Sequence, residues 1–301
     1  KGTIKEMTVP SSLVKAARFG WKWQWEQLMN SLAPSDKEGN YVRPLSDHQN
    51  TDIPSKDELL SKTQIELPTL IIGKSCPWAH RTWLVYKIKG LEDCLNLITA
   101  KPSVSEGKWK LSPSWLGCNY LDEVYKICGS PPSHRSTVPT LIDPSWRNSH
   151  NPKLLCNESA QLVKILDKWP TNHTSIKLYP RELSDEIDGW NFLLQSTVND
   201  GVYKCGFARN QKSYNQASDL LFQSLNTIET SLKEKSPWLC GDNLTLADIR
   251  LFPTLIRWES VYMSLFNCSN QPLWTFPNIW QWRQRLFNYP KVQETCDSAI
   301  W

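Results

Sequence analysis

The segment Ser75-Cys-Pro-Trp-Ala-His-Arg81 places a cysteine where a helix is expected to begin. Pro77 suits the first turn of a helix, because its missing N–H would have no helical acceptor there. At this position the unpaired backbone N–H groups and the helix dipole favour the thiolate and lower the pKa of a thiol. His80 and Arg81 lie within the first turn and are expected to add positive charge. The sequence therefore predicts that Cys76 is a thiolate nucleophile, with an unreactive buried cysteine as the alternative.

No second cysteine accompanies Cys76 at Cys-x-x-Cys spacing, because the fourth position is Ala79. An intramolecular disulfide therefore cannot complete a reaction cycle within this motif. A lone thiolate completes its cycle by exchange with an external thiol, through a mixed disulfide. Glutathione is the obvious candidate for that thiol and would act as a co-substrate.

Two further pairs of residues suit the binding of a small peptide-like thiol. Val138-Pro139 opens a predicted strand after a loop, a setting compatible with a cis peptide bond that turns the preceding backbone groups toward a ligand. Glu158 and Ser159 stand at the start of a predicted helix. There the hydroxyl, the carboxylate and the free helix N–H groups can hold a ligand with both a carboxylate and an amine. The alternative for this second pair is helix capping alone.

Alternating strand and helix signals surround these residues. The apolar run at 67–72 is followed by Gly73 and indicates a buried strand, and the segment after Pro77 carries apolar residues at helical spacing. Further strands are expected at 95–100, 138–143 and 154–156, and a helix at 159–169. Strand, helix, strand, hairpin and helix predict an α/β domain on a small sheet, with Cys76 between the first strand and the first helix.

The C-terminal part of the chain is predicted to be helical. Residues 182–195 and 213–232 carry helical periodicity, and Thr245 with Asp248 forms a capping box that starts another helix. The apolar stretch at 249–258 is expected to be a central buried helix. We therefore expect a lead-in over 1–65, an α/β domain over 66–172 and an all-helical domain over 175–301. The aromatic cluster at 19–25 is expected to pack over the α/β domain.

The overall composition is that of a globular protein. Hydrophobic residues make up 40% and charged residues 21% of the 301 residues, which allows a large core and about two domains. The net charge of +4 is too small to indicate a nucleic-acid partner. The apolar runs are too short to span a bilayer, so no membrane partner is expected.

The nine cysteines are odd in number and lack paired spacing, which argues against a disulfide framework. We expect a reducing, cytoplasm-like compartment, with a plastid as the alternative. No metal site is expected, because the chain has no His-Glu-x-x-His and no paired Cys-x-x-Cys motif. The 16 tryptophans are interpreted as core residues, a few of which could line a site for flat aromatic ligands.

Several motifs in order resemble the glutathione-transferase superfamily, over roughly residues 66–300. Within it, the chain is most similar to the xi class, the glutathionyl-hydroquinone reductases. The motifs that carry this resemblance are Cys76-Pro-Trp-Ala-His-Arg-Thr82, Lys89-Gly-Leu-Glu92, Arg135-Ser-Thr-Val-Pro139, Asn157-Glu-Ser159, Asn199-Asp-Gly-Val-Tyr-Lys204 and Ala247-Asp-Ile-Arg-Leu-Phe252.

The resemblance implies a thioredoxin-like, glutathione-binding domain followed by an all-helical substrate domain, in a homodimer. It also implies that Cys76 attacks the sulfur of a glutathionylated hydroquinone and releases the hydroquinone. A second glutathione would then resolve the mixed disulfide on Cys76. The aromatic substrate would be a small molecule bound beside glutathione.

Further site residues follow from the resemblance. Trp109 matches a tryptophan that packs on glutathione. Four positions match residues that hold the backbone and the charged ends of glutathione: Arg135, Val138, Glu158 and Ser159. Tyr203 and Tyr262 match tyrosines at the hydroquinone site, where a phenol can donate a hydrogen bond or a proton to the leaving aromatic carbon.

The chain departs from the family in two places. The segment before Cys76 reads Pro-Thr-Leu-Ile-Ile-Gly-Lys-Ser, whereas the family has an Arg-Tyr-His-like approach. The family also continues past its last helix with a tail that carries another site tyrosine, whereas this sequence stops at Trp301. The indole of Trp301 can replace the bulk of that side chain, but it has no phenol.

Two other functions are compatible with the sequence. A conjugating glutathione transferase would activate glutathione through a serine or tyrosine hydroxyl, for which Ser75 is the candidate. A non-catalytic carrier would bind hydrophobic ligands on its tryptophan-rich surface and would tolerate replacement of Cys76. The position of Cys76 at a helix start favours the thiol-transfer reductase over both.

Overall fold

The computed structural model describes residues 33–44, 46, 48, 53–145, 151–171 and 176–301. The aromatic cluster at 19–25 lies outside these residues. Its expected packing over the α/β domain therefore stays a prediction. Among the described residues, no helix is long and apolar enough to cross a membrane.

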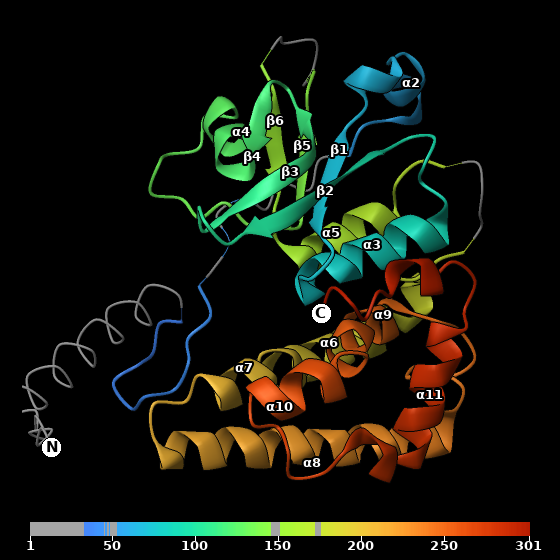
Figure 1. Ribbon diagram of the computed structural model, residues 1–301. Helices are drawn as coiled ribbons and strands as arrows, with labels where there is room; N and C mark the ends of the chain where they lie inside the picture. The colour runs from blue at the N-terminus through green and yellow to red at the C-terminus, as the bar shows by residue number, and fades with distance from the viewer. Residues whose placement is uncertain (1–32, 45, 47, 49–52, 146–150, 172–175) are drawn as a thin grey trace, which may run out of the picture.

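A six-stranded mixed sheet forms the first half of the fold (Figure 1), with the strand order β4-β3-β2-β1-β5-β6. Strand β1 runs parallel to β2, and the remaining neighbours are antiparallel. The strands are β1 (Thr69–Gly73), β2 (Asn96–Ser103), β3 (Lys108–Trp115), β4 (Cys118–Tyr120), β5 (Thr140–Asp143) and β6 (Lys153–Cys156). The predicted strands near 67–72, 95–100, 138–143 and 154–156 are confirmed.

Strands β3 and β4 were not predicted. In β3 only Leu111 is buried, and its neighbours are lysine, serine, proline and tryptophan side chains at intermediate or full exposure. A strand that covers so little core carries no alternating apolar signal. These two strands, with helix α4 (Leu121–Ile127) packed on them, widen the expected small sheet at one edge.

Helices α3 (Pro77–Lys89) and α5 (Ser159–Asp167) pack against each other between the sheet and the C-terminal helices (Figure 1). Both helices confirm the predictions made for them. Ten of the thirteen residues of α3 are buried, because the sheet covers one side of this helix and α9 covers another. The short helices α2 (Lys56–Leu60) and η1 (Gln64–Glu66) precede β1.

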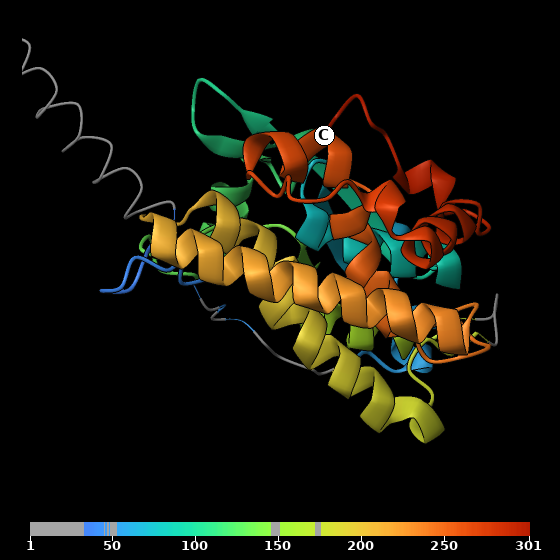
Figure 2. The same cartoon turned by 90° about the horizontal axis from the view of Figure 1, so that it is seen from below.

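The second half of the described chain is helical, as predicted. The long helix α8 packs against α7 and α11 and runs along one side of the helical layer (Figure 2). Two π-helical turns, η4 and η5, interrupt the α-helices. The elements are η3 (Arg181–Leu183), α6 (Ser184–Leu194), η4 (Gln195–Asn199), α7 (Gly201–Gly206), α8 (Gln211–Lys235), α9 (Leu246–Leu255), η5 (Trp258–Tyr262), α10 (Met263–Leu265), η6 (Leu273–Thr275), α11 (Pro277–Phe287) and η7 (Gln293–Thr295).

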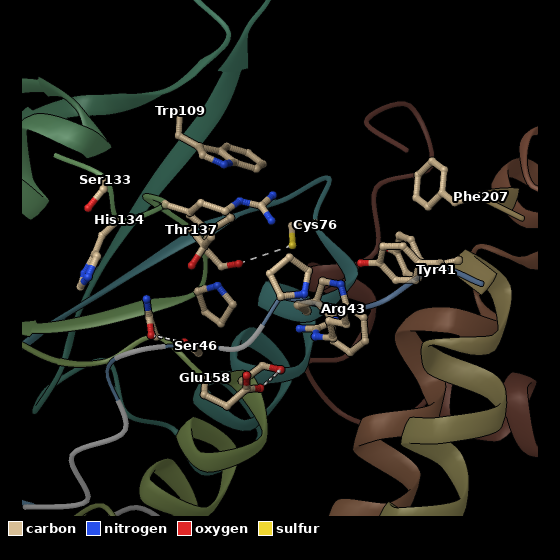
Figure 3. A pocket seen from close by; sticks show the side chains of 18 residues that line it. Tyr41, Arg43, Ser46, Cys76, Trp109, Ser133, His134, Thr137, Glu158 and Phe207 are labelled. Carbon is tan, nitrogen blue, oxygen red and sulfur yellow. Dashed lines mark hydrogen bonds between the residues drawn. The ribbon is translucent and has the colours of Figure 1, made fainter. Parts of the chain in front are cut away.

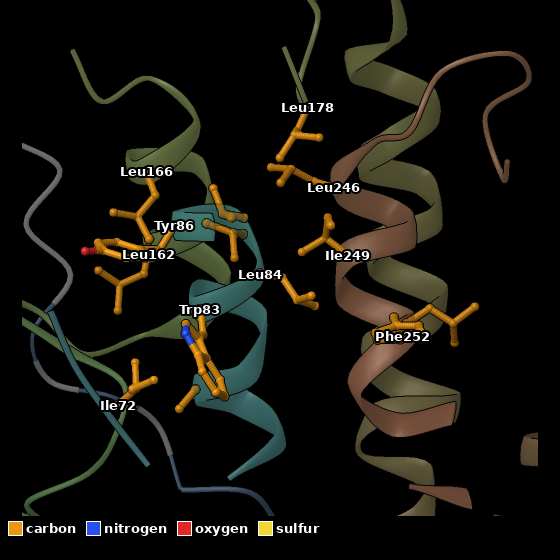
Figure 4. Packing of buried hydrophobic residues seen from close by; sticks show 14 of the residues in the cluster. Ile72, Trp83, Leu84, Tyr86, Leu162, Leu166, Leu178, Leu246, Ile249 and Phe252 are labelled. Carbon is orange, nitrogen blue, oxygen red and sulfur yellow. The ribbon is translucent and has the colours of Figure 1, made fainter. Parts of the chain in front are cut away.

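Helix α9 is the central helix of this layer, as the apolar stretch predicted, and all ten of its residues are buried. Its start is the predicted capping box, in which the Asp248 carboxylate accepts hydrogen bonds from the backbone N–H and the hydroxyl of Thr245. Figure 4 shows Leu84 of α3 beside Ile249 of α9, where the cores of the two halves meet. This apolar contact packs α3, the helix that begins after Cys76, against the helical domain.

Candidate active site

A pocket of about 570 Å³ opens between the two halves at the N-terminal end of α3 (Figure 3). It collects residues from the sheet domain, from the helical domain and from the lead-in. Its lining comprises Tyr41, Arg43, Pro44, Ser46, Cys76, Trp78, Trp109, Ser133, His134, Arg135, Thr137, Val138, Pro139, Asn157, Glu158, Ser159, Tyr203 and Phe207.

Cys76 is the N-cap residue of α3, with extended backbone angles, and it keeps an intermediate exposure to this pocket. Its thiol lies 3.6 Å from the backbone oxygen of Val138, to which it can donate. The Val138–Pro139 peptide bond is cis, as the sequence suggested. The cysteine and the cis-proline turn are therefore direct neighbours in the pocket wall.

The prediction of a low pKa for the Cys76 thiol is wrong for this structure. Burial raises the pKa and is the largest influence on it. The backbone N–H groups of Ala79 and Trp78 oppose this effect, as do the positive charges of Arg257 and Arg43. The helix N-terminus thus acts in the expected direction, but burial has the larger effect.

The positive charge near Cys76 does not come from His80, as the sequence suggested. His80 is buried, and burial lowers its pKa well below the ordinary value, so the ring is neutral. Its Nδ1 accepts a hydrogen bond from Arg257, and its Nε2 lies 2.8 Å from the hydroxyl of Thr295. The charge is supplied by Arg257, from the segment after α9, and by Arg43.

Arg81 is also buried and does not line the pocket. Its guanidinium donates to the hydroxyl of Ser159 at 3.3 Å and lies 4.3 Å from the ring of Trp78. Arg81 therefore supports two pocket residues from behind. Burial lowers its pKa, with the charge of Arg250 as the next cause.

All six residues assigned to glutathione line this one pocket: Trp109, Arg135, Val138, Pro139, Glu158 and Ser159. The Glu158 carboxylate caps α5 by accepting from the N–H of Ala160 at 3.1 Å, so the capping interpretation also holds. Trp109, on the missed strand β3, lies against Gly73 at the end of β1. A methyl group added to Gly73 would be 2.6 Å from the indole.

The two predicted tyrosines are neighbours, with ring centroids 6.1 Å apart. Tyr203 lines the pocket and stacks on Trp78, whereas Tyr262 is buried behind it and does not belong to the lining. Burial raises the pKa of Tyr203 well above its ordinary value and that of Tyr262 to about 12. Both phenols are therefore protonated at neutral pH and can act as donors.

Sequence reasoning missed the contribution of the lead-in. Residues 33–44, 46 and 48, here called the strap, place Tyr41 and Arg43 in the pocket (Figure 3). The strap was interpreted as an extended, irregular lead-in, because it has no apolar periodicity. The one signal in the sequence that could have found them is their residue type, because a tyrosine and an arginine in a polar loop are residues that often bind ligands.

Trp301 packs close to the same region. The Arg257 guanidinium lies 4.4 Å from the Trp301 ring, and the His80 ring lies 6.3 Å from it. The indole therefore covers the arginine that faces Cys76. Within the described part of the chain, no three His, Cys, Asp or Glu side chains are placed to hold a metal ion.

Comparison with known proteins agrees with this architecture. Residues 75–169 match the family model of the glutathione S-transferase N-terminal domain, and residues 211–285 match that of the C-terminal domain. The glutathionyl-hydroquinone reductase PcpF of Sphingobium chlorophenolicum is 34% identical over 76% of this chain and 74% of its own length. The glutathionyl-hydroquinone reductase YqjG of Escherichia coli is 32% identical over 76% of this chain and 71% of its own.

Solved structures show the same relationship. The xi glutathione transferase of Phanerochaete chrysosporium superposes with a TM-score of 0.77 at 30% identity, over 88% of this chain and 87% of its own. The glutathione-bound structure of Escherichia coli YqjG superposes with a TM-score of 0.70 at 31% identity, over 77% of each chain.

The fold and the pocket define a protein with a thioredoxin-like sheet domain, a helical second domain and a cysteine where the two meet. The chain belongs to the glutathione S-transferase family. Structures of the xi class are among its structural neighbours, in agreement with the resemblance carried by the motif that begins at Cys76.

Proposed function

We propose that this protein is a glutathione-dependent reductase that removes glutathione from glutathionyl-hydroquinones or related small glutathione adducts. The observation that carries the proposal is the position of Cys76. Its thiol is at the N-terminus of α3, in one pocket with the six residues assigned to glutathione and with the aromatic pair Trp78 and Tyr203. Two relatives named as glutathionyl-hydroquinone reductases support it.

In the first step, the thiolate of Cys76 attacks the glutathione sulfur of the aryl thioether. A sulfur–sulfur bond forms, the bond between sulfur and the aromatic carbon breaks, and the electron pair stays on that carbon. The N–H groups of Trp78 and Ala79 and the charges of Arg257 and Arg43 favour the thiolate. They offset part of the effect of burial, which favours the neutral thiol.

The aromatic carbon must then take up a proton. Tyr203 lines the pocket and remains protonated, so its hydroxyl is the direct donor that we assign. Tyr262 lies behind Tyr203. Burial raises the pKa of Tyr203, and the hydrogen bond between the two hydroxyls raises it further, so Tyr262 helps to keep that phenol protonated until the carbon takes up the proton. Released hydroquinone is thus the first product.

In the second step, the thiolate of a second glutathione attacks the glutathione sulfur of the mixed disulfide. Oxidised glutathione leaves, and Cys76 returns as a thiolate. Trp109 would pack on the bound glutathione, and the backbone of Val138 would pair with its peptide. Arg135 and the pair Glu158 and Ser159 would hold its charged ends.

The test is the intact mass of the protein after incubation with oxidised glutathione. We expect one glutathione adduct on the wild type and on the control Cys296→Ser, and none on Cys76→Ser. Cys296 is a suitable control, because it is also partly exposed and also lies near Arg257. No adduct on the wild type, or equal adducts on all three, would refute thiol transfer and favour a conjugating or ligand-carrying role.

We also propose a homodimer in a reducing compartment such as the cytoplasm. All nine cysteines are free thiols, which fits a reducing environment.

The homodimer follows from the family resemblance. Light scattering after size-exclusion chromatography tests it, and a monomeric mass at micromolar concentration would contradict it.

A further inference from the structure

The strap is attached to both halves of the molecule and crosses the pocket between its two attachments. On the helical side, the N–H of Arg209 donates to the oxygen of Gly39 at 3.0 Å, and the amide of Asn210 donates to the oxygen of Glu38 at 2.8 Å. On the sheet side, the N–H of Asn157 donates to the oxygen of His48 at 3.1 Å. Among the described residues between these points, Tyr41, Arg43, Pro44 and Ser46 line the pocket.

Arg43 is the charged side chain that the strap places there. Its guanidinium carbon lies 3.5 Å from the ring centroid of Trp78, the residue two positions after Cys76. One of its nitrogens lies 3.4 Å from the Asp200 carboxylate, which is its one hydrogen-bonding partner within the described residues. An arginine has five N–H donors, so most of them stay available to a ligand. The Arg43 side chain is 29% exposed.

The Asp200 carboxylate is shared between Arg43 and a side-chain amide. Its second oxygen accepts from the side chain of Gln195 at 2.9 Å. The amide oxygen of Gln195 in turn accepts from the buried Arg250 at 2.9 Å and from the buried Arg81 at 3.4 Å. Within the described residues, neither buried arginine has a carboxylate within 4.0 Å. Three arginines therefore share the acceptors Asp200 and Gln195, and the charge of Glu158 also acts on the two buried arginines. Arg43 is the one of the three that lines the pocket, where its remaining N–H groups can take an anion.

We propose that Arg43 binds a carboxylate of the bound ligand. This proposal rests on the proposed function, and it names a charge-recognising residue of that site which the sequence motifs do not include. The guanidinium carbon lies 3.5 Å from the ring centroid of Trp78, inside the pocket lining, and the planar fork of its N–H groups matches a planar carboxylate. The carboxylate has two candidate sources. One is an end group of glutathione, and the other is an acidic substituent on the aromatic ring.

The experiment measures binding by calorimetry, in a Cys76→Ser background that prevents exchange. The probes are glutathione, hydroquinone and 2,5-dihydroxybenzoate, which is hydroquinone with a carboxylate. Arg43→Met removes the charge and keeps an apolar chain over Trp78. Lys37→Met is the matched control, because Lys37 is an exposed cation on the same strap.

A loss of about tenfold to a hundredfold in glutathione affinity on Arg43→Met, absent from Lys37→Met, supports the proposal with glutathione as the source of the carboxylate. A loss of that size for 2,5-dihydroxybenzoate but not for hydroquinone supports it with the aromatic ring as the source. Unchanged affinity for both carboxylate probes overturns it. Arg43→Lys is expected to recover only part of the affinity, because an ammonium lacks the planar fork.

Binding is measured without turnover, so this result is independent of thiol transfer. Failure of the proposed function would appear as a wild type that forms no adduct with oxidised glutathione. Failure of the Arg43 assignment would appear as equal affinities in Arg43→Met and Lys37→Met. Circular dichroism of each variant checks that the fold is retained.

Discussion

Arg257 donates a hydrogen bond to Nδ1 of His80 at 2.8 Å, and both side chains are 1% exposed. The two residues are far apart in sequence and belong to different domains. Because a guanidinium can only donate, the histidine must present an unprotonated Nδ1. His80 is therefore a neutral acceptor that orients Arg257, whose charge favours the thiolate of Cys76.

The first prediction concerns stability at low pH. The folded pKa of His80 is well below its ordinary value, so below about pH 6.5 the unfolded chain binds a proton that the folded chain does not. Stability should therefore fall as the pH falls, with up to about 2 kcal/mol from this group between pH 6.5 and 5. Urea unfolding at several pH values measures this change. In His80→Gln, the side-chain amide can still accept from Arg257 but does not titrate, so the loss of stability should be smaller by that amount. The same dependence of unfolding free energy on pH in the wild type and in His80→Gln would contradict the argument.

The second prediction concerns the reactivity of Cys76. Burial raises its thiol pKa, so alkylation by iodoacetamide should keep accelerating with pH beyond the ordinary thiol range. Burial is the largest influence on that pKa, and Arg43 lowers it by less than Arg257 does, so Arg43→Met should raise the pKa further and slow alkylation at pH 7. The adduct on Cys76 is followed by peptide mass. The exposed Lys101→Met is the control, and a slowing as large in that variant would count against a local charge effect.

The third prediction concerns the contact between Gly73 and Trp109. A methyl group on Gly73 would be 2.6 Å from the Trp109 ring and 3.0 Å from a methyl group of Val138, so Gly73→Ala should displace the indole. We expect glutathione affinity to fall about tenfold, by loss of one aromatic packing contact. Calorimetry measures it. Gly189→Ala is the matched control, because nothing lies within 4 Å of a methyl group there. The Gly189→Ala variant should bind glutathione with the affinity of the wild type. The same affinity in Gly73→Ala would contradict the prediction, because the neighbouring side chains would then have accommodated the methyl group without displacing the indole.

The fourth prediction concerns Asp248 at the start of α9. Its buried carboxylate accepts from the N–H groups of Leu239 and Thr245 and from the indole N–H of Trp282, at 2.8–3.1 Å. Asp248→Ala leaves these buried donors without an acceptor and should cost about 4 kcal/mol of unfolding free energy. The exposed Asp242→Ala, six residues earlier, should change stability by less than about 0.5 kcal/mol. Similar losses of unfolding free energy in the two variants would show that the hydrogen bonds accepted by Asp248 are not the cause.

The sequence by itself determined the features that depend on neighbouring residues. Cys76 followed by Pro77 marked the start of α3, and Thr245 with Asp248 marked the start of α9, because capping acts between residues one to three positions apart. The buried strands β1 and β5 were visible as short apolar runs. The family motifs added Tyr203 and Tyr262, whose rings the fold brings within 6.1 Å of each other.

The tertiary structure alone decided what surrounds those residues. Strand β3 buries one side chain and left no pattern, yet it carries Trp109. Arg43 reaches Trp78 from a segment without periodicity, and Arg257 faces Cys76 from 181 positions further along the chain. The direction of the Cys76 pKa was misjudged for the same reason. The helix N-terminus is a local feature, whereas burial is the sum of all the packing around the thiol, which only the folded chain defines.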